Sequence, residues 1–303
     1  MSPRVRRSLA CTVAGMNITP CIAFNDTAEQ AAEFYAHVFS NHTQANVGVT
    51  VPGEPGKPIT STTINIGGAN VGMDIVLINL GDSAKLTPAN SFMVNFDPAT
   101  DLEAEQHLRQ LWEALSDGGT MRMPLQDYPF SPLFGWIEDK FGLNWQLMLT
   151  SKDASPRPHI VPCFLFTDEK PQVKAAIEHW GSFLPFEMGA LVPSPEDASG
   201  DTVLFSDFRL VGDWFNAMDG GSVHQFGFEN GFSLMVNCDN QEQVDRIWEG
   251  LSADPAAEQS GWLKDKFGFS WQILPPGLLE KLQNPENVEK VLQMKKLDLA
   301  EFD

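Results

Sequence analysis

The side chains best suited to hold a small molecule occur in pairs along this chain. Gln146 and Gln272 take the same place in two near-identical stretches, GWIEDKFGLNWQLML from Gly135 and GWLKDKFGFSWQILP from Gly261. Asn95 and Asn237 recur in the same way, in MVNFD and MVNCD. Carboxamides both donate and accept hydrogen bonds. A few such groups among aromatic and aliphatic side chains are typical of small-molecule pockets, so the pairs predict a binding site in each half.

The pairing extends over most of the chain. ITPCIAF from Ile18 matches IVPCFLF from Ile160, and MVNFD matches MVNCD, both 142 residues apart. The spacing falls to 136 for LWEALS and IWEGLS, and to 126 for the two tryptophan-containing stretches. Repeats in a fixed order indicate a duplicated domain. The shrinking spacing places deletions in the second copy, one at a helix start and one in the loop before the final hairpin.

A chain of 303 residues is long enough for two domains, one for each copy. We predict domains at 17–150 and 159–282, joined by the Ser- and Pro-containing linker 151–158. Residues 1–16 are expected to form a disordered extension, and 283–303 a C-terminal helical tail.

Hydrophobic periodicity predicts that each copy runs β-α-β-β-β twice. Thr27 and Gln30 have capping-box spacing at the first helix. Asp139 and Asp265 are expected to close turns through Asx-type bonds. The segment YPFSPLFG from Tyr128 occurs only in the first copy, as a long aromatic loop that could cover a site or pack on the surface.

Alternation along the strands separates two kinds of side chain. In the last strand of the first copy, Trp145 faces the helices and Gln146 faces the other way. We expect Phe24, Phe166 and the two Asn residues to share the face of the Gln residues. A filled core with satisfied polar groups is the alternative.

Bulk composition excludes several functions. With 40 acidic and 20 basic residues the formal charge is -20, which repels nucleic acid and anionic lipid and would favour cationic small molecules. No apolar run reaches the ~18 residues of a membrane helix. Cys21 and Cys163 recur inside apolar strands, which indicates buried thiols in separate cores and a cytoplasmic location. His42, His107, His159 and His224 do not recur, and no role is assigned to them.

The doubled βαβββ module, with PCFLFTD, FSLMVNCDNQEQVDRIWEGLS and GWLKDKFGFSWQILP, resembles the PhnB-like subfamily of the glyoxalase/bleomycin-resistance (vicinal oxygen chelate) superfamily. The resemblance implies an α+β fold of two tandem domains, with curved mixed sheets and helices outside. It also implies a small-molecule ligand, often held through a divalent metal, and an internal pseudo-dimer or a homodimer.

The metal-binding pattern of that superfamily has His on first strands and Glu on last strands. By register these positions fall on Pro20, Ser91 and Gln146, and on Pro162, Ser233 and Gln272. Proline has no ligand atom, and neutral Ser and Gln oxygens bind cations weakly. We therefore predict no tightly held metal cofactor. The expected ligand-binding residues are Phe24, Ser91, Asn95, Gln146, Phe166, Ser233, Asn237 and Gln272.

Three functions stay open at this stage. The first is metal-free binding of a small organic molecule, and the second is a lyase, isomerase or dioxygenase-type reaction with a recruited metal. The third is drug sequestration in the bleomycin-resistance manner. Many members of the subfamily carry the name 3-demethylubiquinone-9 3-methyltransferase. Methyl transfer of the usual kind needs a parallel sheet with a glycine-rich turn, which this strand order does not supply.

Overall fold

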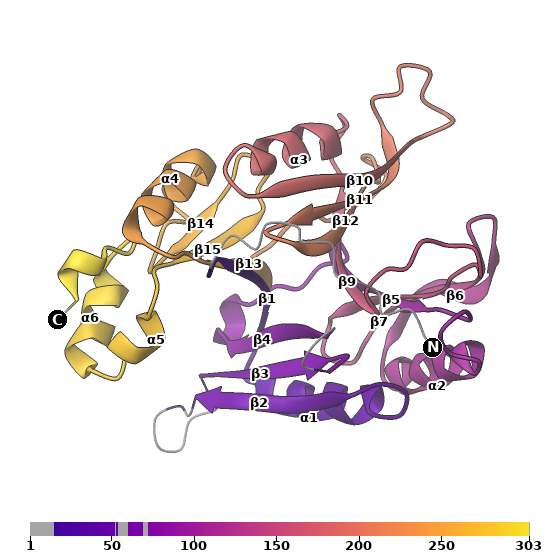
Figure 1. Cartoon of the computed structure of the whole chain (residues 1–303), viewed down its shortest axis with the longest axis horizontal. Coiled ribbons are helices and arrows are strands. Elements are labelled where there is room, and N and C mark those ends of the chain that lie inside the picture. The colour runs from indigo at the N-terminus through magenta and orange to yellow at the C-terminus, as the bar shows by residue number, and fades with distance from the viewer. Residues whose placement is uncertain (1–14, 52, 54–59, 69–71, 303) are drawn as a thin grey trace, which may run out of the picture.

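The computed structural model describes residues 15–51, 53, 60–68 and 72–302. The extension expected at 1–16 therefore lies almost wholly outside the described residues, together with Cys11. Four βαβββ-type modules follow one another, two in each copy (Figure 1). The first copy contains β1 (Asn17–Phe24), α1 (Ala28–Phe39), β2 (Ala45–Val51), β3 (Ser61–Ile66), β4 (Met73–Asn79), β5 (Asn90–Phe96), α2 (Ala104–Ser116), β6 (Thr120–Tyr128), β7 (Ser131–Glu138) and β8 (Asn144–Leu149).

The second copy repeats this order with one strand fewer. Its elements are β9 (Ile160–Phe166), α3 (Val173–Gly181), β10 (Phe186–Pro193), β11 (Val203–Leu210), β12 (Asp213–Asp219), β13 (Phe232–Asn237), α4 (Gln241–Leu251), β14 (Trp262–Lys264) and β15 (Ser270–Leu274). The tail holds α5 (Leu278–Lys281) and α6 (Pro285–Gln293). None of the helices in the described ranges is both long and apolar enough to cross a membrane.

The strand missing from the second copy is the counterpart of β6. In the first copy, β6 and β7 form a hairpin through Tyr128, where we had expected a loop. In the second copy only an isolated bridge between Gln259 and Trp262 remains at this place. The deletion predicted before the final hairpin therefore removed a β-strand from the edge of a sheet, where loss of a strand leaves the rest of the sheet paired.

The two sheets are shared between the copies. The first sheet has the order β14-β15-β13-β1-β4-β3-β2, and the second has β10-β11-β12-β9-β5-β8-β7-β6. The α+β class, the mixed sheets and the tandem repeat are confirmed. Neither copy forms a sheet from its own strands alone. Instead β1 of the first copy pairs antiparallel with β13 of the second, and β5 of the first pairs antiparallel with β9 of the second. The chain thus has the arrangement of an internal pseudo-dimer.

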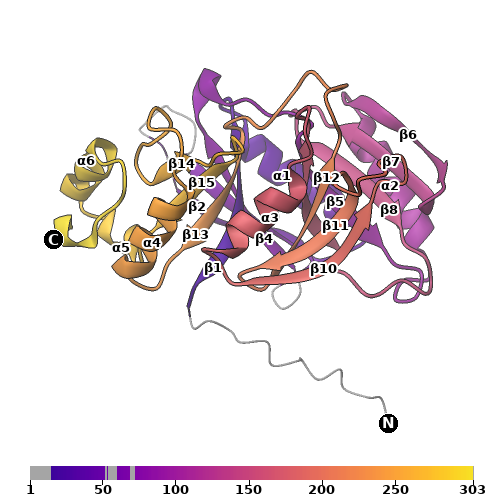
Figure 2. The ribbon, with the colours of Figure 1, turned by 90° about the horizontal axis from the view of Figure 1, so that it is seen from above.

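The helices cover one face of each sheet. Figure 1 shows α1 and α2 along one side of the molecule and α3 and α4 along the other. Figure 2 shows that the tail helices α5 and α6 lie at one end of the molecule and β6 and β7 at the other. Trp145 on β8 is fully buried with its ring 5.2 Å from both Tyr35 and Phe39 of α1. Trp271 on β15 packs in the same way, 5.5 Å from Trp180 of α3. The helix-facing side of each strand therefore forms the core, as the alternation predicted.

A buried carboxylate connects each first helix to the final turn of its own copy. Asp139 Oδ2 accepts hydrogen bonds from Tyr35 Oη at 2.7 Å and from Trp145 Nε1 at 2.8 Å. Asp139 Oδ1 accepts from the backbone N–H groups of Phe141 and Leu143, at 2.8 and 3.1 Å. The predicted Asx-type turn is confirmed, and the second oxygen adds two long-range bonds that the sequence did not reveal.

Asp265 repeats this arrangement with a different helix donor. Its Oδ2 accepts from Trp180 Nε1 at 2.7 Å and Trp271 Nε1 at 2.9 Å, and its Oδ1 accepts from the N–H groups of Phe267 and Phe269. Burial raises the pKa of both carboxyls, against the lowering effect of the tryptophan and backbone donors. We call these two arrangements the carboxylate clasps.

The caps of the first helices come from the last strand of the module. Thr27 makes no side-chain cap bond, so the capping box predicted with Gln30 is wrong. Asn79 Oδ1 at the end of β4 instead accepts from Ala28 N at 3.0 Å. Asp219 at the end of β12 serves α3 in the same way, accepting from Gln172 N and Val173 N. The orphan N–H groups of these helix starts are thus satisfied by tertiary contacts.

Replacing Asp139 with Ala leaves the buried Tyr35 and Trp145 donors and two backbone N–H groups without an acceptor. We expect a loss of about 3–5 kcal/mol in the free energy of unfolding, measured by urea denaturation. Asp127→Ala on β6, an exposed carboxylate of the same module, is the control and should change stability by less than about 0.5 kcal/mol. Equal effects of the two substitutions would contradict a structural role for the clasp.

The first copy expressed alone should not stay monomeric. Without the second copy, β1 and β5 lose the antiparallel partners β13 and β9, and the exposed edges favour pairing with another chain. We expect residues 17–150 to form a homodimer by size-exclusion chromatography with light scattering. A stable monomer with a cooperative unfolding transition would contradict this prediction.

Candidate functional site

A polar group of three side chains sits on the helix-free face of the second sheet, which we call the open face. Gln146 on β8 donates from Nε2 to Ser91 Oγ of β5 at 2.9 Å, and its Nε2 lies 3.5 Å from Cys163 Sγ of β9. The strand register places Ser91 opposite Cys163 across the β5–β9 seam. Gln146 and Ser91 come from the first copy and Cys163 comes from the second. The site is therefore composite.

The first sheet carries the matching group. Gln272 on β15 donates from Nε2 to Ser233 Oγ of β13 at 2.9 Å. Cys21 on β1 faces Ser233 across the β1–β13 seam, and both Gln272 and Ser233 are close enough to lower the pKa of its thiol against the larger effect of burial. We call the two groups the Cys-Ser-Gln triads. Sequence reasoning brought the Ser and Gln residues of each triad to one site, but it missed the thiol.

The register explains why the thiols were missed. The first-strand positions mapped from the metal-binding pattern were Pro20 and Pro162. Pro20 pairs with Leu234, which is a core residue on the helix-facing side. The next residue along the strand, Cys21 or Cys163, takes the open-face position instead. A shift of one residue exchanges the faces of a strand, so the mapped prolines are corrected to these cysteines.

The triads do not fit a divalent metal. Burial raises the pKa of the Cys21 and Cys163 thiols to about 12, so both stay protonated at neutral pH. The amide of each Gln presents its N–H₂ donors, not its oxygen, to the Ser hydroxyl. Metal sites of this kind need thiolate, imidazole or carboxylate ligands. The described residues also contain no group of three or more His, Cys, Asp or Glu arranged to hold an ion.

Charged and aromatic side chains distinguish the open face of the second sheet. Asp207 on β11 is 5% exposed, and its Oδ2 accepts a hydrogen bond from Arg157 Nε at 2.8 Å and forms an ion pair with Arg157 Nη2 at 2.7 Å. The Arg157 guanidinium lies 4.3 Å from the Trp214 ring, and Arg209 lies 4.7 Å from the same ring. Asp207 is paired with Asn216, which in turn is next to Cys163. A charged wall thus flanks this triad.

The first sheet has no arginine–aspartate pair at the matching positions. The register positions that match Asp207 and Asn216 are occupied by Thr63 and Val76, next to Cys21. Thr63 is used locally, accepting a hydrogen bond from Val49 N at 2.9 Å. The two open faces therefore share a neutral triad and differ beside it.

An aromatic wall lies on the other side of the triad in the second sheet. Trp136 on β7 is opposite Gln146 and donates from Nε1 to Asn144 Oδ1 at 3.1 Å. Phe134 is opposite Met148 and packs 5.1 Å from the exposed ring of Phe130. The segment expected as an aromatic loop therefore forms the β6–β7 edge of this sheet.

The other four predicted ligand residues lie outside the triads. Asn95 donates to the carbonyl oxygen of Pro158 at 2.9 Å and so fastens the linker. Asn237 donates to Asn17 Oδ1 at 2.7 Å. Phe24 and Phe166 lie on the helix-facing side, where Phe24 packs against Phe141 and Phe166 against Trp180. Their assignment to the ligand-binding face is therefore wrong, because odd and even positions of β1 and β9 point to opposite sides.

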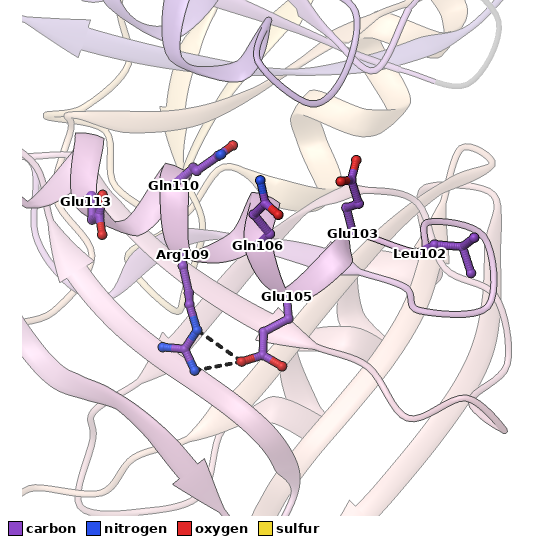
Figure 3. A pocket seen from close by; sticks show the side chains of 7 residues that line it. All are labelled: Leu102, Glu103, Glu105, Gln106, Arg109, Gln110 and Glu113. Atoms are coloured by element: carbon purple, nitrogen blue, oxygen red, sulfur yellow. Dashed lines mark hydrogen bonds and ion pairs between the residues drawn. The ribbon is translucent and has the colours of Figure 1, made fainter.

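Two depressions on the surface do not reach the triads. One lies at the carboxyl end of β1 beside Phe24, Lys85 and Lys140. The other follows the outer side of α2, where Arg109 bonds Glu105 at 2.7 Å (Figure 3). Its lining consists of exposed residues of α2 and of the turn before it: Leu102, Glu103, Glu105, Gln106, Arg109, Gln110 and Glu113. Neither has polar groups that converge on one point.

Comparison with solved structures shows the fold. Glyoxalase I from Zea mays aligns over 91% of this chain and 96% of its own, with a TM-score of 0.55 and 10% identity. The PhnB protein of Bacillus cereus, which carries the name 3-demethylubiquinone-9 3-methyltransferase, is 29% identical. It covers 44% of this chain and 98% of its own, with a TM-score of 0.37. Among curated proteins, none matches the chain significantly.

The family model described as 3-demethylubiquinone-9 3-methyltransferase matches twice, over residues 16–148 and 158–274. Together the two matches span most of the chain and both sets of open-face strands. The chain therefore belongs to this PhnB-like family of the glyoxalase fold, and it contains two tandem copies of the family domain.

Proposed function

We propose that the chain binds a small organic molecule on the open face of the second sheet, without a tightly bound metal there. The observation that carries the proposal is the difference between the two open faces. Both have a neutral Cys-Ser-Gln triad, but only the second sheet adds the Asp207–Arg157 pair beside it. Binding pockets combine apolar walls with a few fixed polar groups, and this face has both.

The side chains around the triad define the chemistry of the ligand. Trp136 on β7 and Trp214 on β12 stand on opposite sides of the β5–β9 seam and are partly exposed. A flat ring can stack on the Trp136 indole, whereas the Trp214 ring already packs against the Arg157 and Arg209 guanidinium groups. Asp207 Oδ2 lies 2.7 Å from Arg157 Nη2 and Asp207 Oδ1 accepts from Ala190 N, so this ion pair offers a ligand the remaining guanidinium donors. An aromatic or heteroaromatic compound with polar substituents suits this arrangement.

The overall charge selects among such compounds. At a formal charge of -20 the chain attracts cations over distances of about a Debye length. A cationic aromatic compound is therefore preferred to an anionic one of the same shape. This property supports drug sequestration as one form of the proposed binding activity.

Methyl transfer is not part of the proposal, despite the family name. Each sheet mixes parallel and antiparallel pairs, and its central seam is antiparallel. The usual methyltransferase places its cofactor on a glycine-rich turn after a strand of a parallel sheet. A lyase, isomerase or dioxygenase-type reaction through a metal would need ligand atoms that the neutral triads lack.

Replacing Trp136 with Ala should weaken binding on the second sheet by about tenfold, the cost of one lost stacking surface. Trp262→Ala is the matched control, because Trp262 stands opposite Gln272 as Trp136 stands opposite Gln146. A thermal-shift screen of cationic, neutral and anionic aromatic compounds identifies ligands, since a ligand of the folded state raises the melting temperature. Isothermal titration calorimetry then compares the variants.

The two substitutions give opposite expectations. Loss of affinity only in Trp136→Ala supports the proposal. Equal loss in both variants, or stabilisation by no compound of the screen, contradicts it.

Removal of divalent ions provides an independent check. We expect chelation with EDTA to leave the affinity for the organic ligand unchanged, because no triad atom serves as a metal ligand. Binding that appears only after addition of a divalent metal would instead favour the metal-assisted enzyme.

A further inference from the structure

Three histidines that do not recur in the sequence meet where the two copies join. His42 follows α1, His107 lies on α2, and His159 directly precedes β9. The Nε2 atoms of His42 and His159 are 3.2 Å apart, and their ring centroids are 5.2 Å apart. The His107 ring lies 6.0 Å from that of His42. The cluster belongs to the helix side of the molecule and is separate from both triads.

Hydrogen bonds set the orientation of two of the rings. His159 Nδ1 is 2.9 Å from the carbonyl oxygen of Asn95, and a carbonyl oxygen can only accept. Nδ1 therefore carries the proton of the neutral ring, which leaves a lone pair on Nε2, the atom that faces His42. His107 Nδ1 contacts Asp101 Oδ2 at 2.6 Å. Metal-ligating histidines are held in this manner, by a backbone carbonyl or a carboxylate on the second ring nitrogen.

The surroundings keep the facing pair uncharged. Burial lowers the pKa of His42 to about 3, with smaller effects from His159 and His107, and burial also lowers the pKa of His159. Phe39 and Phe96 pack against both rings. Asp101 supplies the negative charge close to the group. Two neutral imidazoles beside a carboxylate form a donor set that suits Zn²⁺, Cu²⁺ or Ni²⁺.

We propose that His42 and His159 bind a single divalent transition-metal ion through their Nε2 atoms, in place of the proton that the two nitrogens otherwise share. A zinc ion that makes bonds of about 2.0–2.1 Å to both nitrogens, 3.2 Å apart, has a nitrogen–zinc–nitrogen angle of about 99–106°. That angle is close to tetrahedral, so Zn²⁺ is the preferred ion.

The pair is an incomplete coordination shell. Across the described residues, no third side chain already shares the point between the two nitrogens. His107 is held by Asp101 and stacked on His42, so water would complete the shell. Bound metal would fasten the end of α1 to the start of the second copy, next to the linker that Asn95 holds. The site would thus stabilise the contact between the copies.

The test is metal titration of the full-length protein in chelator-treated buffer. We expect calorimetry to show that the wild-type protein binds one Zn²⁺ ion. We also expect it to bind one Co²⁺ ion, detected by the visible absorption of a tetrahedral cobalt centre. His42→Gln and His159→Gln should each weaken uptake at least tenfold. His37→Gln and His179→Gln, in the last turns of α1 and α3, are the matched controls and should bind as wild type does.

Two results would contradict the proposed metal site. Wild type without one-to-one uptake, or undiminished uptake by His42→Gln, would overturn the proposal and leave a hydrogen-bonded histidine pair only. Should the two Gln variants fail to fold, histidine-selective ¹H–¹⁵N spectra of the wild type decide instead. Zn²⁺ must then shift the Nε2 signals of His42 and His159, and a change confined to the other histidines would refute the site.

Discussion

The carboxylate clasps are the constraint on which the rest of the structure depends. Each places one buried carboxyl among four hydrogen-bond donors, two from the backbone of a turn and two from large aromatic side chains. A buried carboxyl is costly without partners, so the turn and the helix can only approach in the geometry that satisfies it. This requirement fixes Trp145 and Trp271 against the helices. Because strand side chains alternate, it also turns Gln146 and Gln272 to the open faces.

The same acceptor is served by different donors in the two copies. Tyr35 supplies the helix donor to Asp139, whereas Trp180 supplies it to Asp265 from a position one turn further along its helix. The aspartate and its turn are thus the same in both copies, whereas the helix residue that donates to the aspartate differs. The persistence of the aspartate through such a change fits a large penalty for leaving the carboxyl unpaired.

Sharing of sheets between the copies explains why each candidate site is composite. The antiparallel seams β1–β13 and β5–β9 bring a cysteine of one copy beside a serine and a glutamine of the other. Neither triad can form within one copy folded on its own. Because both sites lie in one chain, the residues beside each triad can change independently. They have done so: the second sheet has Asp207 and Asn216 where the first sheet has Thr63 and Val76. The proposed division into one ligand-binding face and one unmodified face follows from this asymmetry.

The sequence alone determined the duplication, the order of the modules, the alternation of Trp and Gln, and the Asx turns at Asp139 and Asp265. These features depend on periodicities and contacts within a few residues, which can be read locally. Tertiary structure alone decided which modules pair, that Cys21 and not Pro20 enters a triad, that Phe24 and Phe166 face the helices, and that His42 meets His159. Strand pairing across a seam uses backbone N–H and C=O groups, which every extended residue except proline presents in full. The amino-acid sequence therefore does not show which two strands will pair. Contacts between His42 and His159, or between Ser91 and Cys163, join parts of the chain that only the completed sheets bring together.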